Sequence, residues 1–311
     1  MKIIILGTGG IGAFYGAKLI LAGHSVKFIA RGEHLKVLKE KGLSLTHSTF
    51  TFNEKIDVCS FEELDSNVIQ ESDAIIFSTK STSTKELAQK LSIVINQNLS
   101  FPYLVSLQNG VENEDILCEY FPEEKVIGGL SRKIGAHIVE AGIIESTGDV
   151  ETIIGAIKEN NLNKSFMEDL KGSLIKADTK CEIVSDIKLE LWKKLIINNG
   201  VNAICALLRV KTGIVMRNEK LSQIVYGLMK ETAVAAKVNN IEISPKDVEQ
   251  MFELIKHFDS IKPSMLVDVE NGRAIEIDEI CNIVIKKCEQ LDYDASYTKT
   301  ISYLLDFIYY N

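Results

Sequence analysis

A glycine-rich segment near the N-terminus constrains the fold of this 311-residue chain more than any other feature. It reads Gly7-Thr8-Gly9-Gly10-Ile11-Gly12, directly after the apolar run 2–7 and directly before the apolar-periodic segment 13–22. A strand, a tight glycine turn and a helix in this order are typical of dinucleotide-binding folds. We therefore expect the segment to bind a dinucleotide, the alternative being a glycine turn with a structural role only.

Each glycine of the motif has a physical reason in such a site. Gly7 permits the tight turn, Gly9 lets the backbone approach a pyrophosphate, and Gly12 lets the helix pack on the strand. The start of the following helix supplies amides and positive potential to phosphates. Thr8, Gly10 and Ile11 belong to the same predicted cofactor-binding loop.

The first part of the chain alternates short β-branched runs with helical patterns, which predicts a parallel, doubly wound α/β sheet of Rossmann type. The runs of this kind lie at 2–7, 25–30, 73–79, 103–108 and 125–130. Further β-like stretches, expected to extend or close the sheet, lie at 49–59, 143–147, 151–155 and 181–184. We assign residues 1–184 to a nucleotide-binding domain.

Long helical patterns replace the alternation after about residue 185, so residues 185–311 are expected to form an all-helical domain. Ser244-Pro245 is a helix start signal, because serine can cap a helix and proline suits its first turn. The C-terminal segment 298–311 should dock as a final helix, which could face a second copy of the chain in a homodimer. No low-complexity linker separates the domains, so a shared cleft is expected.

Composition narrows the classes of function. A net charge of −8 and a pI near 5.3 argue against nucleic acid or an anionic membrane as the main partner, since both need basic surfaces. The six cysteines form no C-x-x-C pair, and neither a signal peptide nor a membrane span is visible. We expect a cytoplasmic protein with a small-molecule ligand. His24 and His137 are isolated, so no metal site is predicted.

The end of the second predicted strand indicates which dinucleotide is bound. An acidic residue there would hold the ribose of NAD, but this chain has Ile29, Ala30 and then Arg31. A guanidinium can bind a 2′-phosphate bidentately, so NADPH is favoured over NADH unless Arg31 is only a solvated surface residue. Lys80 and Asn109 follow later strand ends, where they could touch the cofactor or be, respectively, an exposed lysine and part of a turn.

A row of polar side chains occurs on an otherwise apolar helix. In LWKKLIINNGVN, Lys194, Asn198 and Asn202 are spaced four residues apart and share one helical face. An ammonium placed among apolar residues tends to have a lowered pKa, which suits a general acid near neutral pH. The alternative is that Lys194 reaches solvent and the asparagines link helices.

Together these blocks resemble the ketopantoate reductases (2-dehydropantoate 2-reductases) of the 6-phosphogluconate-dehydrogenase-like superfamily. The resemblance covers essentially the whole chain. GTGGIGAFYGAKLILAGHSV with Arg31 is similar to the family's nucleotide-binding start, and Lys80 and Asn109-Gly110 match its cleft lysine and turn. ELWKKLIINNGVNAICAL resembles the catalytic helix, and KPSMLVDVENGRAIEID resembles the C-terminal signature.

The resemblance implies a role for each matched residue. Lys194 would be the catalytic lysine, which stabilises and protonates the alkoxide formed by hydride transfer from NADPH. Glu276 would orient Lys194 or accept a substrate hydroxyl. Asn109, Asn198, Asn202 and Ser264 would bind the substrate, Ser264 through its carboxylate. The implied reaction reduces 2-dehydropantoate to pantoate, a step of pantothenate and coenzyme A biosynthesis.

Two departures from the family pattern bear on the substrate. Ile261 stands three residues before Ser264, where family members can carry a substrate-holding asparagine, and Cys281-Asn282-Ile283 replaces the usual asparagine-glycine. These changes keep open a paralogous reductase of a different 2-oxo acid. A regulatory dinucleotide-binding protein without turnover is a further alternative, although it would have no use for Lys194, Ser264 and Glu276.

Overall fold

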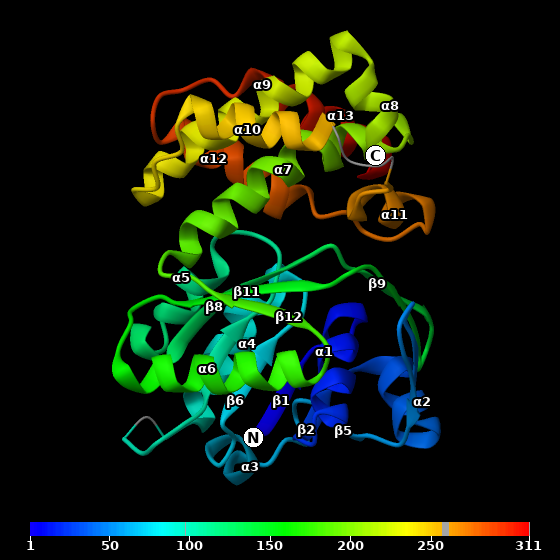
Figure 1. The fold of residues 1–311 in the computed structure, drawn as a ribbon, viewed down its shortest axis with the longest axis vertical. Helices are drawn as coiled ribbons and strands as arrows, with labels where there is room; N and C mark the ends of the chain where they lie inside the picture. Colours follow the sequence, from blue (N-terminus) through cyan, green and yellow to red (C-terminus); the bar gives the residue numbers. More distant parts are fainter. Residues whose placement is uncertain (97, 257–260, 311) are drawn as a thin grey trace. The chain divides into compact units, whose positions relative to one another are not determined.

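The computed structural model describes residues 1–96, 98–256 and 261–310. The chain divides into two compact units, Met1–Ile187 and Lys188–Asn311 (Figure 1). The first unit is an α/β sheet with flanking helices and the second is helical, which confirms the predicted fold class.

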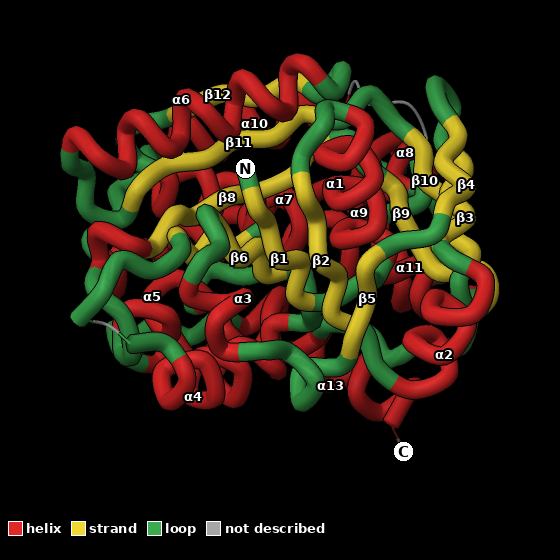
Figure 2. Tube along the Cα trace, turned by 90° about the horizontal axis from the view of Figure 1, so that it is seen from below, coloured by secondary structure: helices red, strands yellow, loops and turns green. Residues whose placement is uncertain are grey.

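The N-terminal unit contains an 8-stranded sheet in the order β12-β11-β8-β7-β6-β1-β2-β5 (Figure 2). The strands from β5 to β8 in this order pair in parallel, whereas β11 is antiparallel to β8. The bounds are β1 Lys2–Leu6, β2 Ser25–Ile29, β5 Asp57–Cys59, β6 Ala74–Phe77, β7 Tyr103–Ser106, β8 Val126–Arg132, β11 Glu151–Ala156 and β12 Lys180–Ile183. Chain order reverses between β1 and β6, where doubly wound sheets bind ligands.

Helices connect these strands. They are α1 Gly10–Leu21, α2 Gly32–Lys41, α3 Ser66–Gln70, α4 Thr84–Val94, α5 Asn113–Cys118 and α6 Asn161–Lys176, with the 3₁₀ turns η1 Ser81–Ser83 and η2 Glu123–Lys125. All five parallel runs predicted from the sequence are strands of this sheet.

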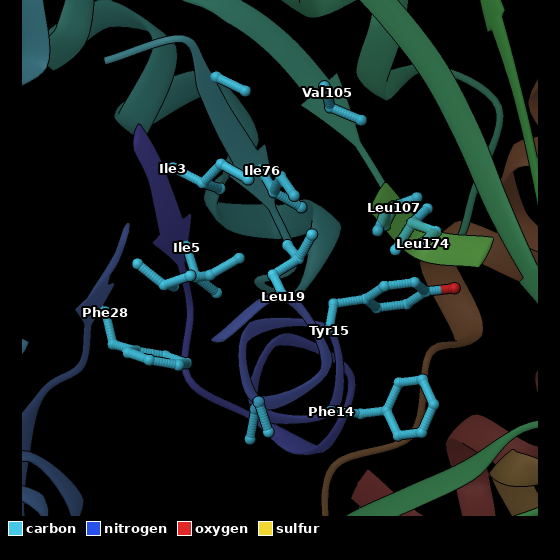
Figure 3. Packing of buried hydrophobic residues seen from close by; sticks show 14 of the residues in the cluster. Ile3, Ile5, Phe14, Tyr15, Leu19, Phe28, Ile76, Val105, Leu107 and Leu174 are labelled. Atoms are coloured by element: carbon cyan, nitrogen blue, oxygen red, sulfur yellow. The ribbon is translucent and has the colours of Figure 1, made fainter. Parts of the chain in front are cut away.

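Alternation along β1 explains how the sheet is covered on both faces. Ile3 and Ile5 belong to one buried cluster, with Phe14 and Tyr15 of α1, while Ile4 and Leu6 belong to a second cluster. Successive side chains of a strand point to opposite faces, so one apolar run supplies both cores. Figure 3 shows the first cluster, with Tyr15 extending from α1.

A second, 4-stranded sheet has the order β4-β3-β10-β9. Its strands are β3 Leu43–Thr46, β4 Thr51–Glu54, β9 Gly135–Glu140 and β10 Ile143–Thr147. The expectation that 49–59 and 143–147 extend the main sheet is therefore wrong for β4 and β10. It is confirmed for β5, and for 151–155 and 181–184, which join the main sheet as β11 and β12. β3 and β9 were not predicted. Periodicity identifies a strand but not its pairing partner, which tertiary packing decides.

The C-terminal unit is built from helices around α9. Its elements are α7 Ile187–Leu208, α8 Thr212–Arg217, α9 Glu219–Ala236, η3 Lys237–Asn239, α10 Pro245–Lys256, α11 Ser264–Glu270, the π-helical turn η4 Asp278–Asn282, α12 Ile283–Glu289 and α13 Ser296–Tyr310. Gly200 of α7 lies so close to α9 that an added Cβ would be 2.8 Å from Cγ of Met229.

Two local predictions for this unit are confirmed. Helix α10 begins at Pro245, where the Ser244 hydroxyl accepts a hydrogen bond from the Asp247 amide (3.2 Å) and the Asp247 carboxylate accepts one from the Ser244 amide (2.9 Å). The last segment forms α13. Within the described residues no helix has the length and apolar character needed to cross a membrane.

Candidate active site

The glycine loop joins β1 to α1 and is held by main-chain contacts. The amides of Gly7 and Thr8 both donate to the Ile29 carbonyl, at 3.2 and 3.1 Å, and the Thr8 hydroxyl donates to the same oxygen at 3.0 Å. Gly7 has φ +99°, which favours glycine, and an added Cβ would lie 2.6 Å from Cγ2 of Thr79. Thr8 therefore shapes the loop by bonding to the end of β2.

Gly9 and Gly12 of the motif differ sharply in the space around them. A Cβ at Gly9 would meet no atom within 4 Å, whereas a Cβ at Gly12 would overlap the Gly7 carbonyl and the Ser78 hydroxyl. Gly12 is therefore needed for close packing, and Gly9 borders open space. The first-turn amides of α1 have no intrahelical acceptor, and no acidic residue lies in that turn. The loop is thus free of negative charge that would repel a phosphate.

Arg31 follows β2 and is the N-cap residue of α2. Its side chain is exposed, and its backbone is extended, with φ −143° and ψ 164°. Glu33 is the acidic residue in the first turn of the same helix. Because β1 and β2 are adjacent parallel strands, Arg31 and the glycine loop lie at the same edge of the sheet.

The loops after β6 and β7 carry Lys80 and Asn109 and are tied together by buried polar side chains. Gln108 is 3% exposed, and its amide nitrogen lies 3.1 Å from the Thr79 carbonyl and 2.8 Å from the Thr84 hydroxyl. Thr84 donates to Asn113 at 2.8 Å, and Asn113 donates to the Asn109 carbonyl at 2.7 Å. Lys80 is exposed and Asn109 is half-buried. The sequence reasoning missed this network.

Helix α7 carries the polar row of the C-terminal unit. Lys194 and Asn198 are half-buried, and Asn202 is 3% exposed. The row therefore passes from the edge of the unit into its interior. Trp192 is 1% exposed on the same helix.

The structure brings Asn202 and Ser264 together although 62 residues separate them in the sequence. The Asn202 amide donates to the Ser264 hydroxyl at 3.4 Å. Ser264 is the first residue of α11, whose N-cap is Pro263, so Ser264 is not the helix cap that its position after proline would allow. Two residues predicted to bind the same substrate thus lie side by side.

Glu276 is half-buried and precedes η4, a π-helical turn at Asp278–Asn282. π-Helical turns are rare and are found frequently at functional sites. Asn282, which departs from the family pattern, donates from its side-chain amide to Asp278 at 2.7 Å and accepts from Ser302 of α13 at 2.7 Å. The Asn282 side chain therefore stabilises the π-helical turn that follows Glu276.

Ile261, the other departure, pairs through its backbone with α8. The Thr212 amide donates to the Ile261 carbonyl at 3.0 Å, and the Ile261 amide donates to the Thr212 hydroxyl at 3.1 Å. The Ile261 side chain is 50% exposed. The backbone bonds do not depend on the residue type, so the side chain at this position is free to vary.

Asn199, next to the predicted row, is a buried linking residue that the sequence reasoning missed. It is 0% exposed, and its amide nitrogen lies 2.9 Å from the Thr232 hydroxyl and 3.2 Å from the Thr298 hydroxyl. Asn199 therefore links α7 to α9 and α13, in addition to the contact that Asn202 of the row makes with α11. The consecutive asparagines at 198 and 199 were the available signal.

A Rossmann-type sheet with an open glycine loop, joined to a helical unit with a lysine and amide row, defines a dinucleotide-dependent oxidoreductase. Residues 3–159 match the model of the family described as "Ketopantoate reductase PanE/ApbA", and residues 186–308 match the model of its C-terminal domain. The chain belongs to the ketopantoate reductase family.

Relatives at 30% identity agree with this assignment. The 2-dehydropantoate 2-reductase of Pyrococcus abyssi is 30% identical over 95% of this chain and 93% of its own length, and that of Archaeoglobus fulgidus is 30% identical over 96% and 95%. Two structures share the fold. The 2-dehydropantoate 2-reductase from Geobacter metallireducens has a TM-score of 0.85 at 24% identity, covering 99% of this chain and 100% of that one. D-mandelate dehydrogenase with NADH and anilino(oxo)acetate has a TM-score of 0.87 at 23% identity, covering 98% and 96%.

Proposed function

We propose that this protein reduces 2-dehydropantoate to pantoate with NADPH. The contact between Asn202 and Ser264 carries this proposal best, because it joins two distant substrate-binding blocks of the family in one place. A dinucleotide-binding protein without turnover would not need that arrangement on the helix that bears Lys194. Family membership and relatives at 30% identity over nearly the whole chain support the same reaction.

The residues of the N-terminal unit fit a dinucleotide. Gly9 borders open space, the first turn of α1 lacks acidic residues, and Arg31 is exposed at the next strand end. We propose that amides of the loop Gly7-Thr8-Gly9-Gly10-Ile11-Gly12 hold the pyrophosphate and that Arg31 binds the 2′-phosphate. Lys80 and Asn109 line the cofactor from the neighbouring strand ends. The absence of a carboxylate before Arg31 favours NADPH over NADH.

A residue of the C-terminal unit supplies the proton that the reduction requires. When bound, NADPH supplies a hydride to the keto carbon and leaves as NADP⁺. The Lys194 ammonium stabilises the negative charge that develops on the carbonyl oxygen and gives it a proton, so the keto group becomes a hydroxyl. Lys194 then recovers a proton from solvent.

The remaining residues bind and orient. Ser264 donates its hydroxyl to the substrate carboxylate, and Asn109, Asn198 and Asn202 offer amides to substrate oxygens without adding charge. Glu276 accepts a substrate hydroxyl or orients the Lys194 ammonium.

A second candidate is the reduction of a different 2-oxo acid by the same machinery. Ile261 favours it, since an exposed aliphatic side chain stands where family members can carry a substrate-holding asparagine. Only the pocket for the acyl side chain would differ. The two candidates share the cofactor, Lys194 and Ser264, and they separate in their choice of acid.

The proposed chemistry is tested by replacing Lys194→Ala, with Lys193→Ala as the matched control. Lys193 is the adjacent residue and forms an ion pair with Glu190 at 2.9 Å. Loss of a general acid should lower kcat by on the order of a hundredfold or more. The control should keep kcat within about twofold, because such an ion pair contributes little. Near-normal turnover of Lys194→Ala would contradict the mechanism.

A further inference from the structure

His34 of α2 connects three segments of the N-terminal unit through its imidazole ring. Its Nε2 lies 2.8 Å from the carbonyl oxygen of Thr8 in the glycine loop, and its Nδ1 lies 3.1 Å from the amide nitrogen of Gly142. The Gly142 amide can only donate, so Nδ1 accepts. Nε2 then carries the proton and donates to the Thr8 carbonyl. The two backbone groups thereby select one neutral tautomer.

Half-burial of the ring supports the same neutral state. Desolvation lowers the pKa of His34 below its ordinary value of 6.5, and this effect outweighs the opposing hydrogen bond to Thr8. A protonated ring would present an N–H to the Gly142 amide and lose that bond. The geometry and the burial therefore agree on a ring that accepts at Nδ1 and donates at Nε2.

The turn that bonds to His34 packs directly on α2. Gly142, between β9 and β10, has φ +79°, and an added Cβ would lie 2.7 Å from Cγ1 of Val37. The same sheet also touches the start of α1, because a Cβ at Gly10 would overlap the Ala136 carbonyl of β9. The second sheet thus contacts both the glycine-loop helix and α2, and His34 bonds to the loop and to the sheet.

Arg31 lies three residues before His34, at the start of the same helix. The Arg31 carbonyl accepts a hydrogen bond from the Leu35 amide at 3.2 Å, so both residues belong to one hydrogen-bonded turn. Fixing His34 against Thr8 therefore fixes the backbone of Arg31 relative to the glycine loop. The pyrophosphate and the 2′-phosphate belong to one ligand. The distance between Arg31 and the glycine loop therefore affects how tightly that ligand is bound.

We propose that His34 is a positioning residue for NADPH, which sets Arg31 at the distance from the glycine loop that the phosphorylated cofactor requires. The inference rests on the proposed function, since it assumes that the loop and Arg31 hold the same cofactor. Its physical basis is preorganisation: a site already in the bound geometry spends less binding free energy on ordering. His34 itself need not touch the ligand.

The test measures NADPH and NADH affinity by titration of the purified protein, for the native chain and three variants. His34→Ala removes both bonds, His34→Gln keeps a donor and an acceptor, and Lys36→Ala is the control on an exposed position of the same helix. His34→Ala should weaken NADPH binding about tenfold, which corresponds to about 1.4 kcal/mol. It should weaken NADH binding less, so the preference for NADPH falls. His34→Gln should recover most of the affinity, and Lys36→Ala should change neither dissociation constant.

Two further measurements separate positioning from a structural role. In an Arg31→Ala background, His34→Ala should add little to the loss of NADPH affinity, because its partner is gone. Nitrogen-15 NMR of the native ring should show the proton on Nε2. Equal losses for both cofactors, an undiminished effect in the Arg31→Ala background, or a proton on Nδ1 would overturn the inference.

The design distinguishes failure of this inference from failure of the proposed function. If native protein binds NADPH and Arg31→Ala weakens it while His34→Ala has no effect, the cofactor assignment stands and the positioning role is wrong. If native protein binds neither dinucleotide, the proposed function itself fails. Should His34→Ala not fold, His34→Asn serves in its place, because its shorter side chain cannot span both backbone partners.

Discussion

The candidate site of the N-terminal unit consists mainly of backbone groups, whereas that of the C-terminal unit consists of side chains. In the N-terminal unit the glycine loop is shaped by backbone, with two amides and a hydroxyl converging on the Ile29 carbonyl. In the C-terminal unit the candidate site consists of side chains from α7, α11 and the segment before η4. A backbone site depends on the absence of Cβ atoms and occupies a contiguous motif. A side-chain site is spread over many residues and can change substrate by exchanging one of them.

The largest effect is expected when single methyl groups are added to the glycine loop. Gly12→Ala would force a Cβ into the Gly7 carbonyl and the Ser78 hydroxyl, so we expect a loss of unfolding free energy of about 3 kcal/mol or more. Gly9→Ala meets no atom within 4 Å and should leave stability within about 0.5 kcal/mol of the native value. Urea unfolding without cofactor measures both.

The same pair separates packing from ligand contact. Gly9→Ala should still weaken NADPH binding by tenfold or more, because its new methyl group occupies the space that we assign to the pyrophosphate. Equal stability of the two variants, or unchanged NADPH affinity in Gly9→Ala, would mean that the loop is not the backbone site described above.

Arg31 is the one cationic side chain that we assign to the adenosine end of the cofactor. Arg31→Ala should raise the dissociation constant of NADPH by roughly 30-fold, within the range of one lost charge-assisted interaction, and leave that of NADH nearly unchanged. Arg31→Lys should give a dissociation constant for NADPH between those of the native protein and Arg31→Ala, because lysine keeps the charge but not the bidentate geometry. An equal effect on both cofactors would show that Arg31 is a surface residue without a role in 2′-phosphate binding.

Ser264 tests the side-chain site. Ser264→Ala should raise KM for the 2-oxo acid by about tenfold, the loss of one hydrogen bond to a charged group, while NADPH affinity stays unchanged. Ser264→Thr keeps the hydroxyl and serves as the matched control. Steady-state kinetics with the acid varied at saturating NADPH gives the result. If NADPH affinity changed and KM for the 2-oxo acid did not, Ser264 would contact the cofactor and not the acid.

The smallest expected effect comes from the core of the N-terminal unit. Tyr15 is 1% exposed in this cluster (Figure 3). Its hydroxyl bonds to Ser131 and Thr152, both at 2.7 Å. Burial raises the pKa of Tyr15 to about 12, so it stays neutral. Tyr15→Phe should lower the unfolding free energy by about 1 kcal/mol without changing either dissociation constant. A change in cofactor affinity would show that this core contact also shapes the loop.

The sequence predicted the parts of the molecule that depend on local pattern. The glycine motif, the five parallel strands and the start of α10 were all found from residues adjacent in the chain. The second sheet was missed because its strands are short and pair across distant segments. A run such as 49–59 shows that it is extended, but not that its halves join different sheets.

The site was predicted unevenly for the same reason. Lys194, Asn198 and Asn202 are candidates because they repeat along one helix, whereas Ser264 and Glu276 are candidates only through resemblance to a family. His34 and Gln108 were missed because their partners include backbone groups of remote segments, such as the Thr8 carbonyl 26 residues away and the Gly142 amide 108 residues away from His34. Such partners leave no pattern in the local sequence.

We assign to this member of the ketopantoate reductase family a backbone site for NADPH and a side-chain site for a 2-oxo acid. The most direct test is kcat/KM for NADPH oxidation with 2-dehydropantoate beside a panel of branched and aromatic 2-oxo acids. We expect 2-dehydropantoate to be preferred by about tenfold or more, because side-chain recognition contributes about 1–3 kcal/mol to such discrimination. Equal values across the panel, or a higher value for another acid, would contradict it.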